Sequence, residues 1–240
     1  MKAWKIVVIP TLITLTIGGI YLSSVWKQRQ NPGAVAQGNA DQKMSDDDLA
    51  VVRAFSPAHF EDTLRLQNTA VWMKNGYTMP YFRYEGGRVQ FNKRVGLIPS
   101  MQRLEVKKIV KAAVPGNVDD GISHGTRQAL AVFALPGSDD QYATAIGAMD
   151  GSEEAYYTDI LFFYDDPHTI YDHWPKDVWA AIDAHQVKPG MSELETRLAI
   201  GQKEHASGQT EGDRTVTYDQ NGKQWKITYV GNKATEIKGE

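Results

Sequence analysis

The sequence predicts an α+β protein with an N-terminal transmembrane helix, an antiparallel β domain (a barrel or a sandwich) and a C-terminal ααβββ module. Three observations lead to this fold class. Residues 6–26 carry no charged side chain. Turn-forming dipeptides recur between residues 69 and 165, and two helix patterns followed by three strand patterns fill residues 174–238.

The uncharged run at residues 6–26 follows a short N-terminal tail, residues 1–5. A helix of about 20 residues spans the roughly 30 Å apolar core of a bilayer, so this run is long enough to cross one. Basic residues flank it on both sides, and the positive-inside rule therefore gives only a slight orientation preference. We expect a retained signal-anchor, which predicts a single-pass inner-membrane protein with a periplasmic body. A cleaved secretory signal and a buried core helix are the alternatives.

Composition narrows the class of protein further. The chain has no cysteine, which excludes a lipidated N-terminus, disulfides and thiolate metal sites. All 29 acidic residues but only 22 of the 26 basic residues lie beyond residue 29, which gives residues 30–240 a net charge of −7. An acidic body without a stripe of Lys and Arg argues against nucleic acid as a partner.

Two segments precede the predicted β domain. Residues 27–44 are rich in Gln, Asn, Gly and Ala, which predicts a disordered tether. Residues 45–68 read as a helical lead-in. Ser45 followed by three aspartates predicts one helix start, and Ser56 followed by Pro57 predicts a second.

Residues 69–165 have the closely spaced turns of a hairpin-built antiparallel sheet. In the run that begins at Leu104, the alternation of apolar and polar residues slips at Lys107 and Lys108, which predicts a β-bulge. Two runs, 129–135 and 159–164, are almost wholly apolar, so they indicate either burial on both faces or an exposed edge that accepts a partner strand. The predicted strands are residues 77–84, 88–95, 104–114, 128–135, 141–149 and 155–164.

The C-terminal module begins with a helix from Trp174, with Pro175 in its first turn. Ser192 and Glu195 form an S-x-x-E capping box at the start of a second helix, and Gly201 is the predicted stop. A polar loop follows. Strands are then expected at residues 214–219, 224–230 and 234–238.

Residues 187–192 (Val-Lys-Pro-Gly-Met-Ser) and 221–225 (Asn-Gly-Lys-Gln-Trp) carry a family resemblance. The order of elements and these motifs make residues 174–238 similar to the SmpA/OmlA (BamE-like) family of small envelope proteins. The family signature is a Gly-Met-Thr helix start followed by strands with a Gly-Gly-Lys-x-Trp turn. The resemblance implies a non-catalytic module that holds protein partners together.

The densest polar cluster lies between the two predicted parts and offers candidate metal ligands. Carboxylate and imidazole groups suit Zn, Mn or Fe, and a helical segment would place His168 and Asp172 one turn apart. Pro167 and the position of the cluster favour a structural loop instead, so no catalytic, cofactor or metal site is predicted. The weak metal candidates are Asp165, Asp166, His168, Asp172 and His173.

The leading functional hypothesis is a non-enzymatic, membrane-anchored adaptor or assembly protein of the bacterial envelope, which binds an envelope protein and needs no cofactor. Aromatic residues are the usual anchors of interfaces, and Trp179, Trp225 and Tyr229 are therefore the interface candidates. One alternative is a metal-dependent hydrolase that uses the loop from Asp165 to His173. The other is a membrane-anchored regulatory domain that faces the cytoplasm.

Overall fold

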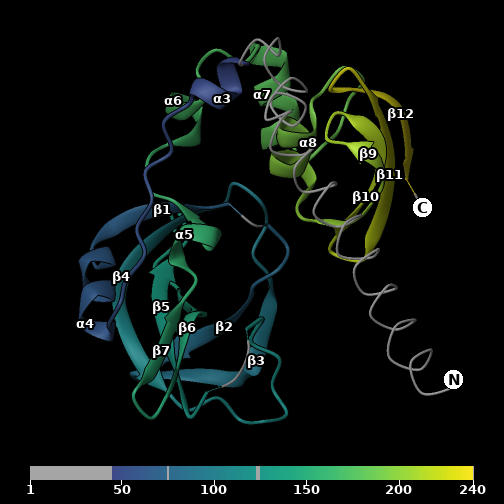
Figure 1. Cartoon of the computed structure of the whole chain (residues 1–240). Coiled ribbons are helices and arrows are strands. Elements are labelled where there is room, and N and C mark those ends of the chain that lie inside the picture. Colours follow the sequence, from purple (N-terminus) through teal and green to yellow (C-terminus); the bar gives the residue numbers. More distant parts are fainter. Residues whose placement is uncertain (1–44, 75, 123–124, 240) are drawn as a thin grey trace, which may run out of the picture. The chain divides into compact units, whose positions relative to one another are not determined.

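The computed structural model describes residues 45–74, 76–122 and 125–239 (Figure 1). The chain divides into two compact units, residues 1–49 and 50–240. In the first unit, the helix α3 (Asp46–Leu49) has Ser45 before it, whose hydroxyl accepts a hydrogen bond from the Asp48 amide at 3.3 Å. All other elements described below belong to the second unit.

An antiparallel sheet of eight strands makes up most of residues 69–163, and it curls strongly (Figure 1). Its order is β3-β2-β6-β5-β4-β1-β8, and β7 pairs with β6. The edge strands β3 and β8 do not pair with each other, so this is one open sheet. The strands are β1 (Thr69–Met73), β2 (Pro80–Glu85), β3 (Arg88–Leu97), β4 (Arg103–Ala112), β5 (Arg127–Ala134), β6 (Gln141–Asp150), β7 (Glu153–Tyr156) and β8 (Phe162–Phe163).

Two local features of the sequence, a Gly-Gly turn and a break in the alternation of apolar residues, form the structures that are typical of them. The pair Gly86-Gly87 closes the hairpin between β2 and β3 with positive φ angles of 58° and 77°, a conformation that glycine adopts without strain. The predicted bulge is confirmed, because the register between β4 and β5 shifts between Val106 and Lys108. The extra residue lets β4 keep Ile109 buried on the same side as Val106.

The two apolar runs have different structures. β5 lies in the middle of the sheet and is buried over Gln128–Ala134, which confirms burial on both faces. The second run was wrongly predicted as a continuous strand. It forms one turn of helix, α5 (Thr158–Leu161), before the two-residue β8. The Thr158 hydroxyl donates to the Phe55 carbonyl oxygen at 2.7 Å, and this contact favours the turn over an extended chain.

The C-terminal part is a four-stranded antiparallel sheet, ordered β12-β11-β10-β9, with two helices. The capping box of Ser192 and Glu195 and the stop at Gly201 are confirmed, since they begin and end α8. The segment expected to be a polar loop is instead β9, an edge strand whose polar side chains gave no alternating pattern. The elements are α7 (Lys176–Asp183), α8 (Glu193–Ile200), β9 (Lys203–Thr210), β10 (Asp213–Gln220), β11 (Lys223–Val230) and β12 (Lys233–Gly239).

The helical lead-in is shorter than predicted. Its second helix does not start at Ser56 and Pro57, because residues 50–57 have no regular secondary structure and helix begins only at α4 (Phe60–Thr63), followed by η1 (Leu64–Leu66). A further short helix, α6 (Pro167–Ile170), lies in the segment from Asp165 to His173, for which the sequence favours a structural loop. The longest described helices, α7 and α8, have only 8 residues each.

These findings correct the predicted fold class. The described residues form mainly antiparallel sheet, because the hairpin signals extend through the C-terminal part as well. The α+β description with a transmembrane helix is therefore wrong.

The predicted anchor at residues 6–26, with its neighbouring tail and tether, lies outside the described residues. Within the described residues, no helix is both long and apolar enough to span a membrane. The assignment to the inner membrane, with its signal-anchor and periplasmic terms, is corrected because nothing described supports it.

Candidate functional site

Three of the five metal-ligand candidates, Asp165, Asp166 and His168, have structural partners. Asp165 forms an ion pair with Arg53 at 3.1 Å. Asp166 is the N-cap of α6, where its carboxylate accepts the His168 amide at 3.0 Å. Asp172 and His173 are exposed in the turn that precedes α7. Across the described parts of the chain, no group of three or more His, Cys, Asp or Glu residues is placed to hold a metal ion.

The imidazole of His168 links α6 to α7. Its Nδ1 lies 3.0 Å from Asp166 Oδ1, and its Nε2 lies 3.2 Å from Asp183 Oδ1. The ring also stacks on Trp179, with centroids 4.0 Å apart and planes at 26°. Both ring nitrogens of His168 contact carboxylates and one face of the ring stacks on Trp179. We therefore interpret His168 as a structural residue that joins the two helices. Sequence reasoning missed Asp183, since it lies fifteen residues away on another helix.

The three interface candidates differ in exposure. Trp179 and Tyr229 are only 9% and 1% exposed, so both belong to the core between the helices and the four-stranded sheet. Trp225 is half-buried. Its indole N–H donates to Gln220 Oε1 at 2.8 Å, and Lys223 Nζ lies 4.1 Å from its ring centroid. Trp225 is therefore the one of these three whose side chain presents appreciable surface.

A buried ion pair holds α8 to β10. The Glu193 carboxylate is 5% exposed and accepts the Gly212 amide at 2.7 Å. Arg214 donates to it through Nε at 3.0 Å and Nη2 at 2.8 Å. This fork raises the pKa of Arg214, because the hydrogen bonds to Glu193 stabilise the charged guanidinium. The pair is satisfied within the fold, which points to a structural role.

The outer edge of β1 is different, because part of it is open. β4 pairs with β1 over Thr69–Trp72, whereas β8 pairs with it only at Trp72 and Met73. Peptide groups alternate in direction along a strand. The Met73 amide donates to Gln102 O on the β4 side, and the Lys74 amide donates to Leu161 O on the β8 side. Ala70 has the parity of Lys74, so its N–H and C=O point to the outer edge, where no described strand pairs with it.

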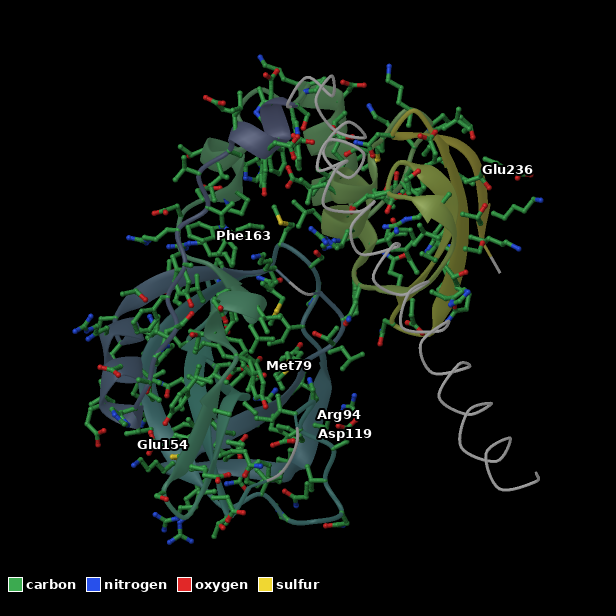
Figure 2. The ribbon with its side chains drawn as sticks, viewed as in Figure 1. Met79, Arg94, Asp119, Glu154, Phe163 and Glu236 are labelled. Carbon is green, nitrogen blue, oxygen red and sulfur yellow. The ribbon has the colours of Figure 1, made fainter. Side chains whose placement is uncertain are left out.

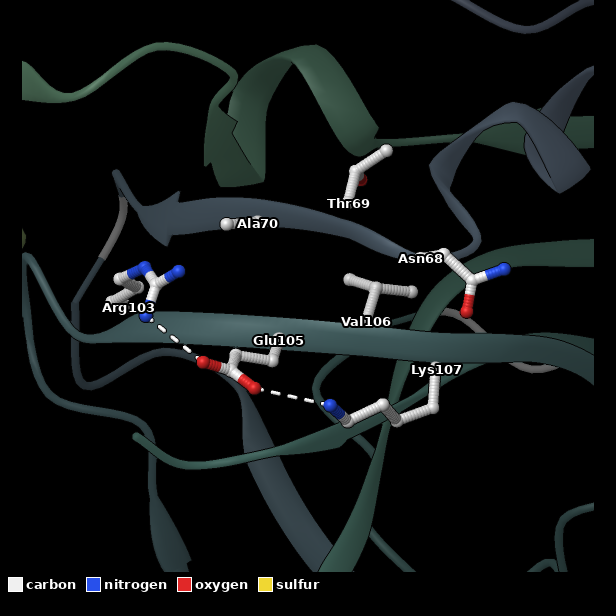
Figure 3. A pocket seen from close by; sticks show the side chains of 7 residues that line it. All are labelled: Asn68, Thr69, Ala70, Arg103, Glu105, Val106 and Lys107. Atoms are coloured by element: carbon white, nitrogen blue, oxygen red, sulfur yellow. Dashed lines mark hydrogen bonds and ion pairs between the residues drawn. The ribbon is translucent and has the colours of Figure 1, made fainter. Parts of the chain in front are cut away.

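Two adjacent hollows meet at this point of β1. One has a volume of about 260 Å³ and the other about 300 Å³, and both are lined by Thr69 and Ala70. Figure 3 shows the second of them. The first has an apolar floor that includes Phe55 and Leu66, with the guanidinium-bearing Arg53 and Arg65 at its rim. We call the outer edge of β1 at Thr69 and Ala70, together with these two hollows, the β1-edge site.

Cationic side chains dominate the rim of the second hollow too. Arg103 and Lys107 both line it, and each forms an ion pair with Glu105, at 2.9 and 3.0 Å (Figure 3). The hydrogen bond from Lys107, with its positive charge, lowers the pKa of Glu105. The β1-edge site therefore has four cationic side chains and a single lining carboxylate, although residues 30–240 are acidic as a whole.

Comparisons with known proteins do not help to interpret this site. Comparison of the chain with family models, curated proteins and solved structures found no match. The resemblance of residues 174–238 to the SmpA/OmlA family thus stays a prediction.

Sequence reasoning did not find the β1-edge site. Its cations come from four places in the chain, and none forms a basic run with another. An exposed strand edge is predicted at residues 129–135 or 159–164, but the open edge belongs to β1, a five-residue strand that is not among the predicted strands. The edge of β1 is open at Ala70 because β8 is only two residues long, and no pattern in the sequence indicates that β8 is so short.

Proposed function

We propose that this protein is a non-enzymatic protein-binding module, an adaptor that adds an extended segment of its partner to the β1-edge site. The observation that carries the proposal is the unpaired outer edge of β1 at Ala70, a residue that lines both hollows with their cationic side chains. An exposed edge offers backbone hydrogen bonds to an extended peptide, and flanking pockets select its side chains.

Charge specifies the class of partner segment. Arg53, which pairs with Asp165, and Arg65 line one hollow. Arg103 and Lys107, which share Glu105, line the other. Four cations against these two carboxylates leave an excess of positive charge that an extended segment with acidic side chains complements. Ala70 adds a small side chain at the centre, which leaves room for a neighbouring strand. The alternative of a metal-dependent hydrolase gains no support, since no described cluster could hold the metal.

Fluorescence anisotropy with two labelled peptides tests the proposal on the full chain. One peptide alternates Val and Glu, and its twin has Lys in place of Glu. We expect the acidic peptide alone to bind, and more weakly at high salt, since salt screens exposed charges. Equal binding of both peptides, or binding of neither, contradicts the proposal.

Two variants and one control locate the peptide. Ala70→Pro removes the outward N–H while it keeps the β4 pairing of its neighbours, and Arg65→Glu reverses a rim charge. Each should weaken binding of the acidic peptide by about tenfold, or about 1.4 kcal/mol. Arg88→Glu makes the same change of charge at an exposed position of β3 and should have no effect. If Arg65→Glu and Arg88→Glu weaken binding of the acidic peptide equally, the affinity depends on the net charge of the protein and not on the β1-edge site.

A further inference from the structure

The second face of the eight-stranded sheet carries a small core of its own. Leu130, Val132 and Ala143 are fully buried there, apart from the main core on the opposite face. The residues that cover them are only partly buried: Tyr84, Val89, Phe91, Val110 and Ala112. The apolar residues that cover this cluster are therefore themselves partly accessible to solvent.

The pairing of the edge strand β3 is interrupted beside this cover, at Phe91. Its pairing with β2 moves from Arg83↔Gln90 to Phe82↔Arg94, so residues 91–93 have no partner in the register. A bulge of this size bends the strand and redirects side chains. The Phe91 ring packs edge-on against Phe82, with centroids 5.4 Å apart and planes at 67°.

A pocket of about 500 Å³ lies at the bulge, between β3 and the connection from β4 to β5. Its volume falls within the range of small-molecule sites, about 300 to 1,000 Å³. Phe82, Phe91, Pro115 and Val118 supply apolar walls. Polar residues complete the lining, among them Arg94 and Asp119, which are labelled in Figure 2.

The two charged lining residues are not equivalent. The Asp119 carboxylate accepts the Gly121 amide at 3.0 Å, and this bond holds the turn in which Gly121 has a φ of 85°. Arg94 is exposed and makes no ion pair with any residue that the structure describes. Its guanidinium can therefore receive a carboxylate in a two-bond fork, the geometry that Arg favours.

We propose that this pocket binds an amphipathic carboxylic acid, a small molecule with an apolar alkyl or aryl body and one carboxylate. The body lies on Phe82 and on Phe91, one of the partly accessible residues that cover the second-face cluster, while the carboxylate pairs with Arg94. The pocket shares no lining residue with the β1-edge site, so this inference does not depend on the proposed function.

Isothermal titration calorimetry of the full chain with decanoate, below the concentration at which it forms micelles, tests the proposal. Decanol is the matched probe, since it has the same chain without the carboxylate. We expect decanoate to bind with one-to-one stoichiometry and about tenfold more tightly than decanol. Equal affinity for the two probes, or saturation by neither, overturns the proposal.

Three variants make the result specific to the pocket. Arg94→Ala should weaken decanoate binding by about tenfold and leave decanol binding nearly unchanged. Val118→Trp should fill the pocket and abolish binding of both probes. Arg65→Glu alters only the β1-edge site and should leave decanoate binding intact, so failure of one proposal is distinguishable from failure of the other. An unchanged decanoate affinity in Arg94→Ala overturns the assignment.

Discussion

Two tyrosine hydroxyls meet inside the C-terminal core. Tyr218 Oη and Tyr229 Oη lie 2.9 Å apart, and both residues are 1% exposed. Burial raises the pKa of Tyr229 to about 12, and it raises the pKa of Tyr218 as well, because a phenolate in an apolar core loses its hydration. Aromatic residues in this part of the chain were expected to include an interface anchor, but these two instead bind each other.

This pair predicts a stability loss in alkali. Tyrosine in the unfolded chain has a pKa near ~10, below the folded value for Tyr229. The folded state therefore holds its proton more tightly, and the stabilisation is complete below pH ~10 and is lost as the pH rises toward ~12. The loss amounts to at most about 1.4 kcal/mol per pH unit for one group.

Tyr229→Phe isolates this effect. At pH 8 the variant should be less stable than the wild type by about 1 kcal/mol, since the Tyr218 hydroxyl loses its partner. Between pH 10 and 12 the difference in the free energy of unfolding between the two proteins should narrow. Only the wild type has a phenol at residue 229 whose ionisation destabilises the folded state. Urea unfolding at pH 8, 10 and 11.5 measures the difference. A gap that stays constant across this range would show that residue 229 does not titrate differently in the two states.

At the scale of elements, the helix start of α8 is defined by reciprocal bonds. The Ser192 hydroxyl accepts the Glu195 amide at 3.1 Å, and the Glu195 carboxylate accepts the Ser192 amide at 2.6 Å. We expect Ser192→Ala to lower the free energy of unfolding by about 1 kcal/mol, because one helix N–H then lacks an acceptor in a buried setting. Ser192→Thr keeps the oxygen and should retain most of the stability. Thermal melting of the three proteins gives the test, and equal losses in Ala and Thr would contradict a capping role.

The capping box also illustrates what the sequence could predict. Ser192 and Glu195 interact at a spacing of three, and the bulge at Lys107 and Lys108 shows in the local alternation, so both were found from the sequence. Glu193 lies between the two capping residues, yet its partner Arg214 is 21 positions away on β10. No local pattern links them, because only the packing of α8 on the sheet brings them together.

Edge strands mark the limit of such predictions. The sequence predicts a loop where β9 lies, because an edge strand with a solvated side needs neither apolar residues nor strict alternation. The open edge of β1 was missed for a related reason, since it depends on where β8 ends and not on the residues of β1. The β1-edge site and the pocket beside Arg94 both arise where pairing stops or slips, and pairing is a long-range property.

At the scale of residues 50–240, a fully buried side chain of the eight-stranded sheet packs in the core of the C-terminal part. Phe163 lies in β8, paired with Trp72 of the eight-stranded sheet through the register of β1. Yet it packs in the core formed by α7, α8 and the four-stranded sheet, and it is 1% exposed. Its ring also meets Tyr171, with centroids 6.3 Å apart. The two sheets therefore share a buried residue, and we expect them to unfold together.

Phe163→Ala tests this coupling. Loss of a buried Phe should cost about 3 to 5 kcal/mol, and the cost should appear in a single transition that includes both sheets. Differential scanning calorimetry compares the calorimetric enthalpy with the van't Hoff enthalpy, which agree for one cooperative unit. Ile160→Ala, at a 54% exposed position two residues before β8, is the control and should change stability by no more than about 0.5 kcal/mol. Two separated transitions, with only one shifted by Phe163→Ala, would mean that each sheet folds alone and that β8 merely connects them.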